Sequence, residues 1–310
     1  MVRIGCINID TSHPRAFNEI FCRGDRARYV AVYNDGFRSD GEVEGFMKLC
    51  GIKRRAQSVE EVAQQVDVGF IQGCNWDKHL SYVEPFFRLG KPVFLDKPMV
   101  GCLRDVQKLR AYVEQGAVIL GSSCMRYAPA IVDFLALPEE ERGKIVSVHS
   151  TCGVDEFNYA IHAVEAIGGL LGRGAVSCQY VGGGEVDGIR GETYAVQYAS
   201  GAVATYGMTY GQWQKSAVHV LTTKKTYALE PAGYENMLER VIASVETGQA
   251  QTAPVEDILE SILIMLAGRI SRARGGARVA LAEIPPEDPG FDGDAFEREY
   301  AASAKPLYAQ

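Results

Sequence analysis

The sequence predicts an α/β protein in which an N-terminal doubly wound, Rossmann-like domain is followed by an α+β domain with an open, mainly antiparallel sheet. Residues 1–122 alternate short, apolar, β-rich runs with helical patterns, and strict alternation of this length implies a mainly parallel sheet. From residue 123 onward, strand-like runs follow one another directly, which favours an antiparallel sheet. The 310 residues suffice for two such domains, and we expect them at residues 1–122 and 123–310.

Apolar runs and helix signals predict the elements of the first domain. We expect strands at residues 2–9, 29–33, 66–72, 92–95 and 118–121. Between them we expect helices at residues 15–21, 42–50, 59–65, 78–89 and 103–115. Ser58 followed by Glu61 has the spacing of a capping box, and Gly51, Gly90 and Gly116 fall where helices should end.

The second domain is expected to contain one long run of strands framed by helices. We expect strands at residues 143–150, 175–181, 193–198, 202–210, 217–223 and 226–229, and helices at 157–171, 234–247 and 258–274. Glycine-rich turns at residues 182–184 and 200–201 separate the strands. Residues 285–294 are expected to form an irregular surface segment.

Composition and charge exclude several classes of partner. The formal net charge of −7 argues against nucleic acid or an anionic membrane as the main partner. No apolar stretch approaches the roughly 20 residues that cross a bilayer, and Met1 leads directly into a strand pattern without a signal sequence. Eight cysteines are scattered without zinc spacing, so we expect reduced thiols and no metal site. These observations together predict a cytoplasmic protein.

Lys97 is the most informative residue. It lies in Lys91-Pro-Val-Phe-Leu-Asp-Lys-Pro98, directly after an apolar run that has the composition of a buried strand. Open α/β sheets bind their ligands at the carboxyl ends of their strands. A lysine shifts its pKa readily when it is buried, and it can then transfer protons near neutral pH. Lys97 is therefore a candidate for catalysis, although strands also commonly end in a solvated lysine.

The first strand-to-helix turn is the place where a dinucleotide pyrophosphate would bind, and it lacks the expected glycines. The fingerprint is G-x-G-x-x-G, but Asn8, Asp10 and His13 occupy the glycine positions. Asn and Asp tolerate left-handed backbone conformations, so the shape of the turn can survive, with Thr11 or Ser12 capping the helix. Asp10 places a negative charge close to the phosphates, and Asp10 with His13 is also a candidate substrate or ion site.

The end of the second strand carries Asn34 and Asp35, where an acidic residue would bind the adenosine ribose. Asp35 favours NAD over NADP, whereas the nearby Arg38 could meet a 2′-phosphate. An ordinary Asn-Asp-Gly turn explains the same residues, so both interpretations stay open.

Several motifs now occur in one characteristic order. Val66-Asp-Val-Gly-Phe-Ile-Gln-Gly-Cys-Asn-Trp-Asp-Lys-His79 precedes the Lys97 motif, and Arg126-Tyr-Ala-Pro129 and Asn158-Tyr-Ala-Ile-His-Ala-Val-Glu165 follow it. In this order and spacing the chain resembles the glucose–fructose oxidoreductase / inositol dehydrogenase (Gfo/Idh/MocA) family over essentially its whole length. The resemblance implies an NAD(P)-dependent oxidoreductase, with NAD preferred, that acts on a sugar, cyclitol or related polyol.

The resemblance also implies roles for individual residues. Lys97 and His162 match the catalytic residues, and the Lys97–Pro98 peptide bond is expected to be cis. The residues expected to contact substrate are Asn158, Arg126, Tyr127 and Tyr159. The residues expected to contact the cofactor are Asn8, Asp10, Thr11, His13, Asn34, Asp35, Cys74, Asn75, Trp76, His79, Asp96 and Lys97.

Two departures from the family pattern leave a second hypothesis open. Asn158 stands where many members carry a carboxylate, and an amide can hold a hydroxyl but cannot take its proton. The phosphate turn has no glycine. A Rossmann-scaffold protein without redox activity, either a non-redox lyase or hydrolase or a ligand-binding protein, would explain both departures. Under either hypothesis we expect a homodimer or homotetramer, because an uncovered sheet face in the second domain favours self-association.

Overall fold

The computed structural model describes residues 1–121 and 123–308; Ser122, the last residue of the expected first domain, lies outside the described part. The first half of the chain forms a five-stranded parallel sheet in the order β2-β1-β3-β4-β5. Its strands are β1 (Val2–Ile7), β2 (Ala27–Tyr33), β3 (Val68–Ile71), β4 (Val93–Leu95) and β5 (Ile119–Gly121). This order reverses direction between β1 and β3, and doubly wound folds bind ligands beside such a switch point.

The helices of the first half begin and end at the expected signals. They are α1 (His13–Phe21), α2 (Asp40–Cys50), α3 (Val59–Gln65), α4 (His79–Arg88) and α5 (Leu103–Glu114). The side chain of Ser58 accepts from the Glu61 amide at the start of α3, as its spacing predicted. Helix α2 ends at Gly51 with a φ of 72°, a left-handed conformation that glycine adopts without strain.

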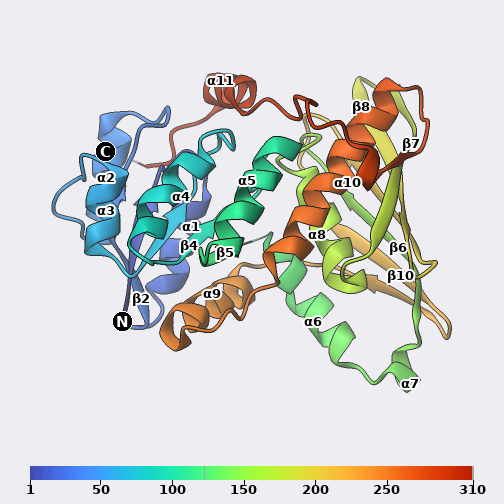
Figure 1. The fold of residues 1–310 in the computed structure, drawn as a ribbon, viewed down its shortest axis with the longest axis horizontal. Coiled ribbons are helices and arrows are strands. Elements are labelled where there is room, and N and C mark those ends of the chain that lie inside the picture. Colours follow the sequence, from blue (N-terminus) through green and yellow to red (C-terminus); the bar gives the residue numbers. More distant parts are fainter. Residues whose placement is uncertain (122, 309–310) are drawn as a thin grey trace.

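The second half forms a seven-stranded sheet in the order β11-β10-β6-β9-β8-β7-β12. Its strands are β6 (Ile145–Cys152), β7 (Ala175–Val186), β8 (Ile189–Tyr198), β9 (Val203–Thr209), β10 (Ala217–Thr222), β11 (Thr226–Leu229) and β12 (Val279–Ala280). The pair β6–β9 is parallel and the other pairs are antiparallel, so the expected mainly antiparallel sheet is confirmed. Helices α8 (Ala160–Leu171) and α10 (Val255–Ala273) pack on one face of this sheet (Figure 1).

One expected turn is wrong. Residues 182–184 lie inside β7, which pairs with β8 as far as Val186, and the chain reverses at Asp187 and Gly188 instead. Both turn residues have positive φ, 53° and 78°, which a tight two-residue hairpin needs. A run of three glycines looked like a loop, but the long partner strand β8 keeps it extended.

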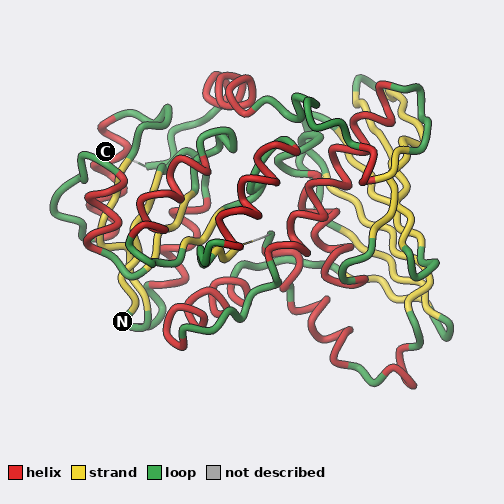
Figure 2. The backbone as a smooth tube through the Cα atoms, in the orientation of Figure 1, coloured by secondary structure: helices red, strands yellow, loops and turns green. Residues whose placement is uncertain are grey.

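Short elements that the sequence patterns did not predict complete the chain. They are η1 (Cys124–Tyr127), α6 (Pro129–Ala136), α7 (Glu139–Arg142), η2 (Leu281–Glu283) and α11 (Gly293–Ser303). Figure 2 shows that α11 lies between two stretches of irregular chain. No helix among the described residues is both long and apolar enough to span a bilayer.

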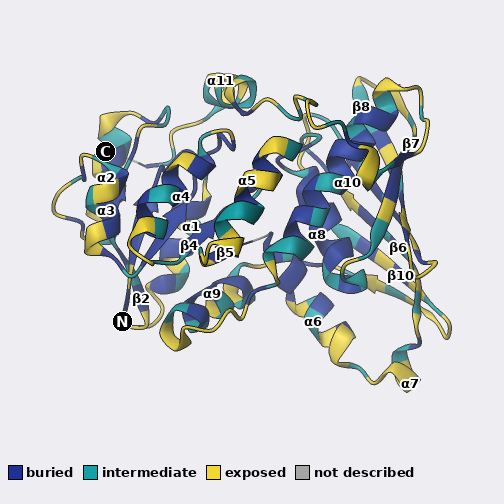
Figure 3. Ribbon diagram, viewed as in Figure 1, coloured by how far each residue is buried: buried dark blue, intermediate teal, exposed yellow. Residues whose placement is uncertain are grey.

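Two late segments return to the first sheet. Helix α9 (Glu235–Thr247) contributes Met237, Leu238 and Val241 to the same apolar cluster as β1. Beyond α11, the chain returns to α2 (Figures 1 and 3). There Tyr308 packs against Phe46 and is buried. Because these segments belong in space to the first sheet, the division into two functional domains at residue 122 stays a prediction.

Candidate active site

A pocket of about 240 Å³ lies between the two sheets and brings together four of the titratable residues that the sequence singled out, His13, Lys97, Tyr159 and His162. Its lining includes Ser12, His13, Lys97, Tyr159, His162 and Trp213. The first three come from the carboxyl ends of β1 and β4, and the others come from the second half of the chain. The pocket is smaller than the roughly 300 Å³ or more of a typical drug-sized site, so it suits a small molecule.

Lys97 enters this pocket from the end of β4. The Lys97–Pro98 peptide is cis, as the resemblance implied. Lys97 Nζ donates to the backbone oxygen of Asn158 at 2.9 Å and to its Oδ1 at 2.8 Å, and lies 5.4 Å from the centre of the Tyr159 ring. Burial lowers the pKa of Lys97, although the nearby Asp96 carboxylate opposes the shift. Asn158 thus holds the ammonium instead of taking a proton.

His162 lies in the first turn of α8, on the other side of the pocket. Its Nδ1 is 2.6 Å from the hydroxyl oxygen of Ser123, and no other described residue hydrogen-bonds to the ring. Burial, together with the charges of Lys97 and His13, holds the pKa of His162 well below its ordinary value of 6.5. His162 is therefore neutral at pH 7, with Nε2 available to a ligand.

His13 contacts a carboxylate that sequence patterns did not pair with it. Its Nδ1 is 2.6 Å from Asp96 Oδ2, and its ring stacks on Phe17 with a centroid distance of 5.1 Å. Burial alone would raise the pKa of Asp96, but the charge and hydrogen bond of His13 and the charge of Lys97 outweigh it and lower the pKa. The expected cofactor residues His13 and Asp96 therefore form a pair beside the substrate pocket.

Arg126 and Tyr127 lie outside the pocket lining. Arg126 Nε donates to Glu165 Oε2 at 2.9 Å, and both side chains are buried. This pairing explains why Glu165, one turn beyond His162, is polar in an otherwise apolar helix. The Tyr127 hydroxyl accepts from the Ala253 amide at 2.8 Å, an arrangement that joins η1 to the segment before α10. Neither side chain lines the pocket that Lys97 and His162 share, so a contact of Arg126 or Tyr127 with substrate stays a prediction.

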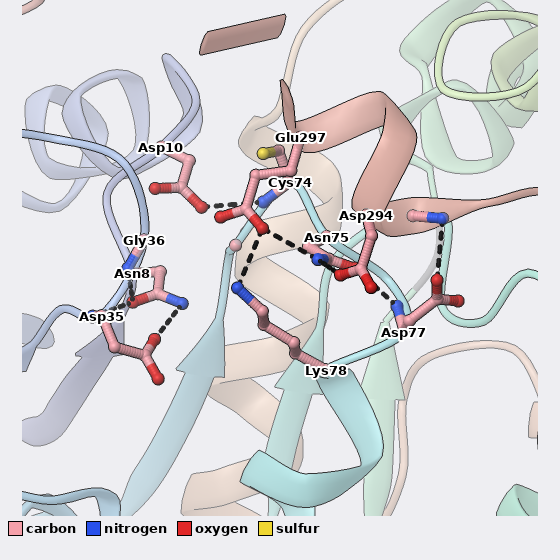
Figure 4. Close-up of polar contacts among 12 residues, drawn as sticks. Asn8, Asp10, Asp35, Gly36, Cys74, Asn75, Asp77, Lys78, Asp294 and Glu297 are labelled. Carbon is pink, nitrogen blue, oxygen red and sulfur yellow. Dashed lines mark hydrogen bonds and ion pairs between the residues drawn. The ribbon is translucent and has the colours of Figure 1, made fainter. Parts of the chain in front are cut away.

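The residues expected to hold the adenosine half of a dinucleotide are bonded to one another. Asn8 has a φ of 65°, so the left-handed turn survives without glycine. Its Oδ1 accepts from the Asp35 amide at 2.9 Å, while its Nδ2 donates to the Asp35 carboxylate (Figure 4). The same carboxylate also accepts from the Tyr82 hydroxyl. Asn34 Oδ1 accepts from the Ile9 amide at 3.1 Å. Arg38 donates to the Asp10 backbone oxygen.

The loop after β3, which carries the expected cofactor residues Cys74 and Asn75, contacts helix α11 (Figure 4). Asn75 Nδ2 donates to Asp294 at 2.7 Å and to Glu297 at 2.9 Å. Lys78 Nζ pairs with Glu297 at 2.8 Å. Asp10, Cys74 and Glu297 bring ligand-type atoms within 4.8 Å of one another, so the carboxylate of Glu297 lies beside the turn that would cradle a phosphate.

The remaining expected cofactor residues have structural partners. Trp76 Nε1 donates to the Phe291 backbone oxygen at 2.8 Å. Both ring nitrogens of the buried His79 lie near backbone oxygens, Nδ1 at 3.0 Å from Met99 and Nε2 at 2.9 Å from Gly73. Thr11 Oγ1 accepts from the His13 amide at 3.2 Å, at the start of α1.

These contacts do not fit a dinucleotide. Anionic phosphates bind where backbone amides and cations converge. Here two carboxylates, Asp10 and Glu297, lie at that place, and the C-terminal segment covers the ends of β1 and β3. Sequence reasoning did not anticipate this, because α11 has no strong apolar periodicity and only Gly293 of the helix is buried.

The arrangement of the two sheets defines the class of fold. It is the fold of the Gfo/Idh/MocA-type dehydrogenases, as the sequence resemblance implied. No protein-family model matches the chain, and no curated protein matches it in sequence.

Three solved structures illustrate the similarity. A putative myo-inositol dehydrogenase from Sinorhizobium meliloti superposes with a TM-score of 0.76 at 19% identity, covering 91% of this chain and 100% of its own. A probable dehydrogenase from Thermotoga maritima has a TM-score of 0.76 at 16% identity, covering 92% and 100%. The myo-inositol dehydrogenase from Lactobacillus casei, in complex with NAD(H) and myo-inositol, has a TM-score of 0.76 at 15% identity, covering 90% and 96%. At such identities the likeness establishes the fold.

Proposed function

We propose that the protein is an enzyme that transfers protons on a small polyhydroxylated carbonyl compound, and that it does so without a dinucleotide. The observation that carries this proposal is the pocket in which the Lys97 ammonium and the neutral His162 imidazole face the same small cavity. A neutral imidazole that can accept a proton and an ammonium whose pKa burial lowers are groups that general acid–base catalysis can use.

The proposed reaction is proton abstraction next to a carbonyl group. His162 Nε2 takes the proton from the carbon beside the carbonyl, and the C–H electron pair moves into a carbon–carbon double bond. The carbonyl oxygen then carries the negative charge, which the Lys97 ammonium stabilises by a hydrogen bond. Return of a proton to the same carbon on its opposite face completes an epimerisation. Transfer of the proton to the former carbonyl carbon, while the proton of the neighbouring hydroxyl passes to the enolate oxygen, completes an isomerisation, so that atoms and electrons balance without an oxidant.

The substrate class follows from the rim of the pocket. Trp213 is 71% exposed and still contributes to the lining, so an aromatic face is offered at the entrance. Aromatic faces pack well on the apolar side of sugar and cyclitol rings, whose hydroxyls then point to polar groups. The fold relatives that act on inositols support a ring-shaped, hydroxylated substrate.

Exchange of carbon-bound hydrogen tests the proposal without knowledge of the product. Aldoses, ketoses and keto-cyclitols would be incubated with the protein in D₂O, and the loss of proton signals would be followed by NMR. We expect exchange at the carbon beside the carbonyl in at least one compound, and none with His162→Asn. If no compound of the panel exchanges, the proposal is wrong.

A second candidate function is the NAD(P)-dependent oxidation or reduction of a sugar, cyclitol or related polyol, with NAD preferred. The solved relatives that carry NAD(H) favour it. Titration of the intact protein with NADH and with NADPH, followed by fluorescence, separates the two candidates. Binding together with polyol-dependent formation of NADH would establish the second, and no binding at millimolar cofactor would remove it.

A further inference from the structure

Residues 291–308 cross the carboxyl edge of the first sheet along the path that a dinucleotide would take. Phe291, Asp294 and Glu297 contact the loop after β3. Glu297 then lies beside Asp10 at the end of β1. The Lys305 backbone oxygen accepts from Arg38 Nη1 at 2.8 Å, in the loop after β2. In a doubly wound sheet this crevice beside the switch point is the ligand site.

We propose that residues 291–308 are a built-in occupant of this crevice, which permanently replaces the dinucleotide and holds the neighbouring substrate pocket in shape. We call these residues the C-terminal strap. The proposal concerns the crevice and stands whichever substrate the pocket binds.

The surface under the strap is unsuited to a phosphate. Asp10 Oδ2 accepts from the Cys74 amide at 3.1 Å, and its other oxygen has no hydrogen-bond partner among the described residues. Burial raises the pKa of Asp10 to about 6, and the charge of Glu297 adds to this rise. A β-carbon on Gly36 would lie 2.0 Å from Asp10 Oδ1, so the chain there makes room for the carboxylate. A pyrophosphate at this place would meet negative charge on a buried oxygen.

The strap is anchored at both ends. At its start, Trp76 Nε1 binds the Phe291 backbone oxygen, and the Phe296 ring lies 4.9 Å from Trp76. At its end, the Leu307 amide donates to Glu42 at 3.1 Å, and Tyr308 is only 5% exposed against Phe46. The ion pair of Glu297 with Lys78 contributes little by itself, about 0–1 kcal/mol. Aromatic contacts at both ends, to the buried Trp76 at the start and through the buried Tyr308 at the end, favour a permanent element.

The strap also reaches the catalytic lysine through one aromatic contact. The Phe291 ring stacks on Phe157 with a centroid distance of 4.0 Å and an angle of 8° between the planes. Phe157 precedes Asn158, whose two oxygens hold Lys97 Nζ. The strap therefore braces the loop that positions Lys97, which makes Phe291 a positioning residue.

The test compares the intact protein with a chain that ends after Gly290. NADH binding would be followed by fluorescence, and hydrogen exchange of residues 153–162 by mass spectrometry. We expect neither protein to bind NADH at millimolar concentration, and the loop to exchange at least tenfold faster in the shortened chain. A synthetic peptide of residues 291–310 should restore its protection. NADH binding by either protein, or an unchanged loop, would overturn the proposal, because the strap would then be a removable lid or a passive tail.

Point variants keep the test decisive if the shortened chain does not fold. Phe291→Ala removes the stacking on Phe157 while the strap stays in place, and it should also speed exchange of residues 153–162. Arg298→Ala, an exposed position of α11, is the matched control and should leave the exchange unchanged. Equal behaviour of the two variants would contradict the bracing role. None of these measurements depends on turnover, so they can be interpreted even if no compound exchanges hydrogen in the D₂O experiment.

Discussion

Lys97 and His162 approach one pocket from different halves of the chain, and each depends on a neighbour for its chemical state. Asn158 keeps Lys97 Nζ in place through two oxygens, and Ser123 occupies one nitrogen of His162. Because burial disfavours the charged form of both groups, each pKa is shifted downward. The pocket therefore places a neutral base opposite an ammonium that gives up its proton more readily than a solvated lysine.

Removal of the ammonium should abolish the proposed chemistry and leave the fold intact. The Lys97→Met variant keeps an unbranched side chain at this position but removes the charge that stabilises the enolate. We therefore expect deuterium exchange to slow by about 10²–10⁴-fold. Lys215→Met is the control, since Lys215 also lines the pocket but pairs with Glu230 at its exposed rim. Circular dichroism would verify folding. An equal loss of exchange rate in both variants would show that the Lys97 ammonium has no specific catalytic role.

The pH dependence of the exchange rate should report both groups. His162 works in its neutral form, so the rate should fall on the acid side only when pH drops through its lowered pKa, below 6.5. Lys97 works in its protonated form, so the rate should fall on the alkaline side at a pH below 10.5. Rates measured from pH 4 to 11 for the wild type and His162→Gln test this. An acid limb that survives in His162→Gln would show that another group is the base.

At the scale of elements, the contact between α11 and the β1–α1 turn joins two carboxylates. Burial and Glu297 raise the pKa of Asp10 from 3.8 to about 6, so the folded protein holds a proton that the unfolded chain releases. This stabilisation is complete below pH 4 and is lost as pH rises through about 6.

Asp10→Asn should therefore stabilise the protein at neutral pH. Its amide oxygen can still accept from the Cys74 amide, while the buried charge is gone. We expect a gain of about 3 kcal/mol at most in the free energy of unfolding at pH 7.5, and almost none at pH 4. Urea denaturation at the two pH values measures it. Asp133→Asn, an exposed position of α6, should change nothing, and a loss of stability in Asp10→Asn at pH 7.5 would contradict the interpretation.

The sequence predicts elements well where local signals and burial agree. Helix α3 begins at its Ser58 cap, and all five strands of the first sheet occur where apolar runs predicted them. Prediction from the sequence fails where contacts between residues far apart in the chain determine the local structure. The glycines at 182–184 are extended because β8 pairs with them, and α11 forms against Trp76 and Asn75, which lie more than 200 residues earlier.

The candidate site shows the same limit. Lys97, His162 and Tyr159 were predicted to serve one site, and the structure places them together in the pocket lining. The pairing of Arg126 with Glu165 and that of His13 with Asp96 join residues 39 and 83 positions apart. No local spacing encodes such pairs, so a single sequence could suggest the residues but not their partners.

At the scale of the whole molecule, the seven-stranded sheet has one face that no described helix covers. A row of side chains crosses this face in register, with His149 between His219 and Thr205, and Thr205 beside Ala195. Val203 and Leu221 on the same face are 39% and 37% exposed. A sheet face that carries exposed valine and leucine beside alanine, threonine and histidine is a surface on which a second sheet can pack.

We propose that two copies of the chain pack through this face, as a homodimer or as part of a homotetramer. Ala195→Arg places a charge near its centre and should yield a monomer, because burial of an unpaired guanidinium between two sheets is costly. Light scattering coupled to size-exclusion chromatography measures the mass directly. Gln107→Arg on α5 adds the same charge elsewhere and should leave the assembly intact. A wild-type monomer, or an Ala195→Arg protein of unchanged mass, would rule out this face as the interface.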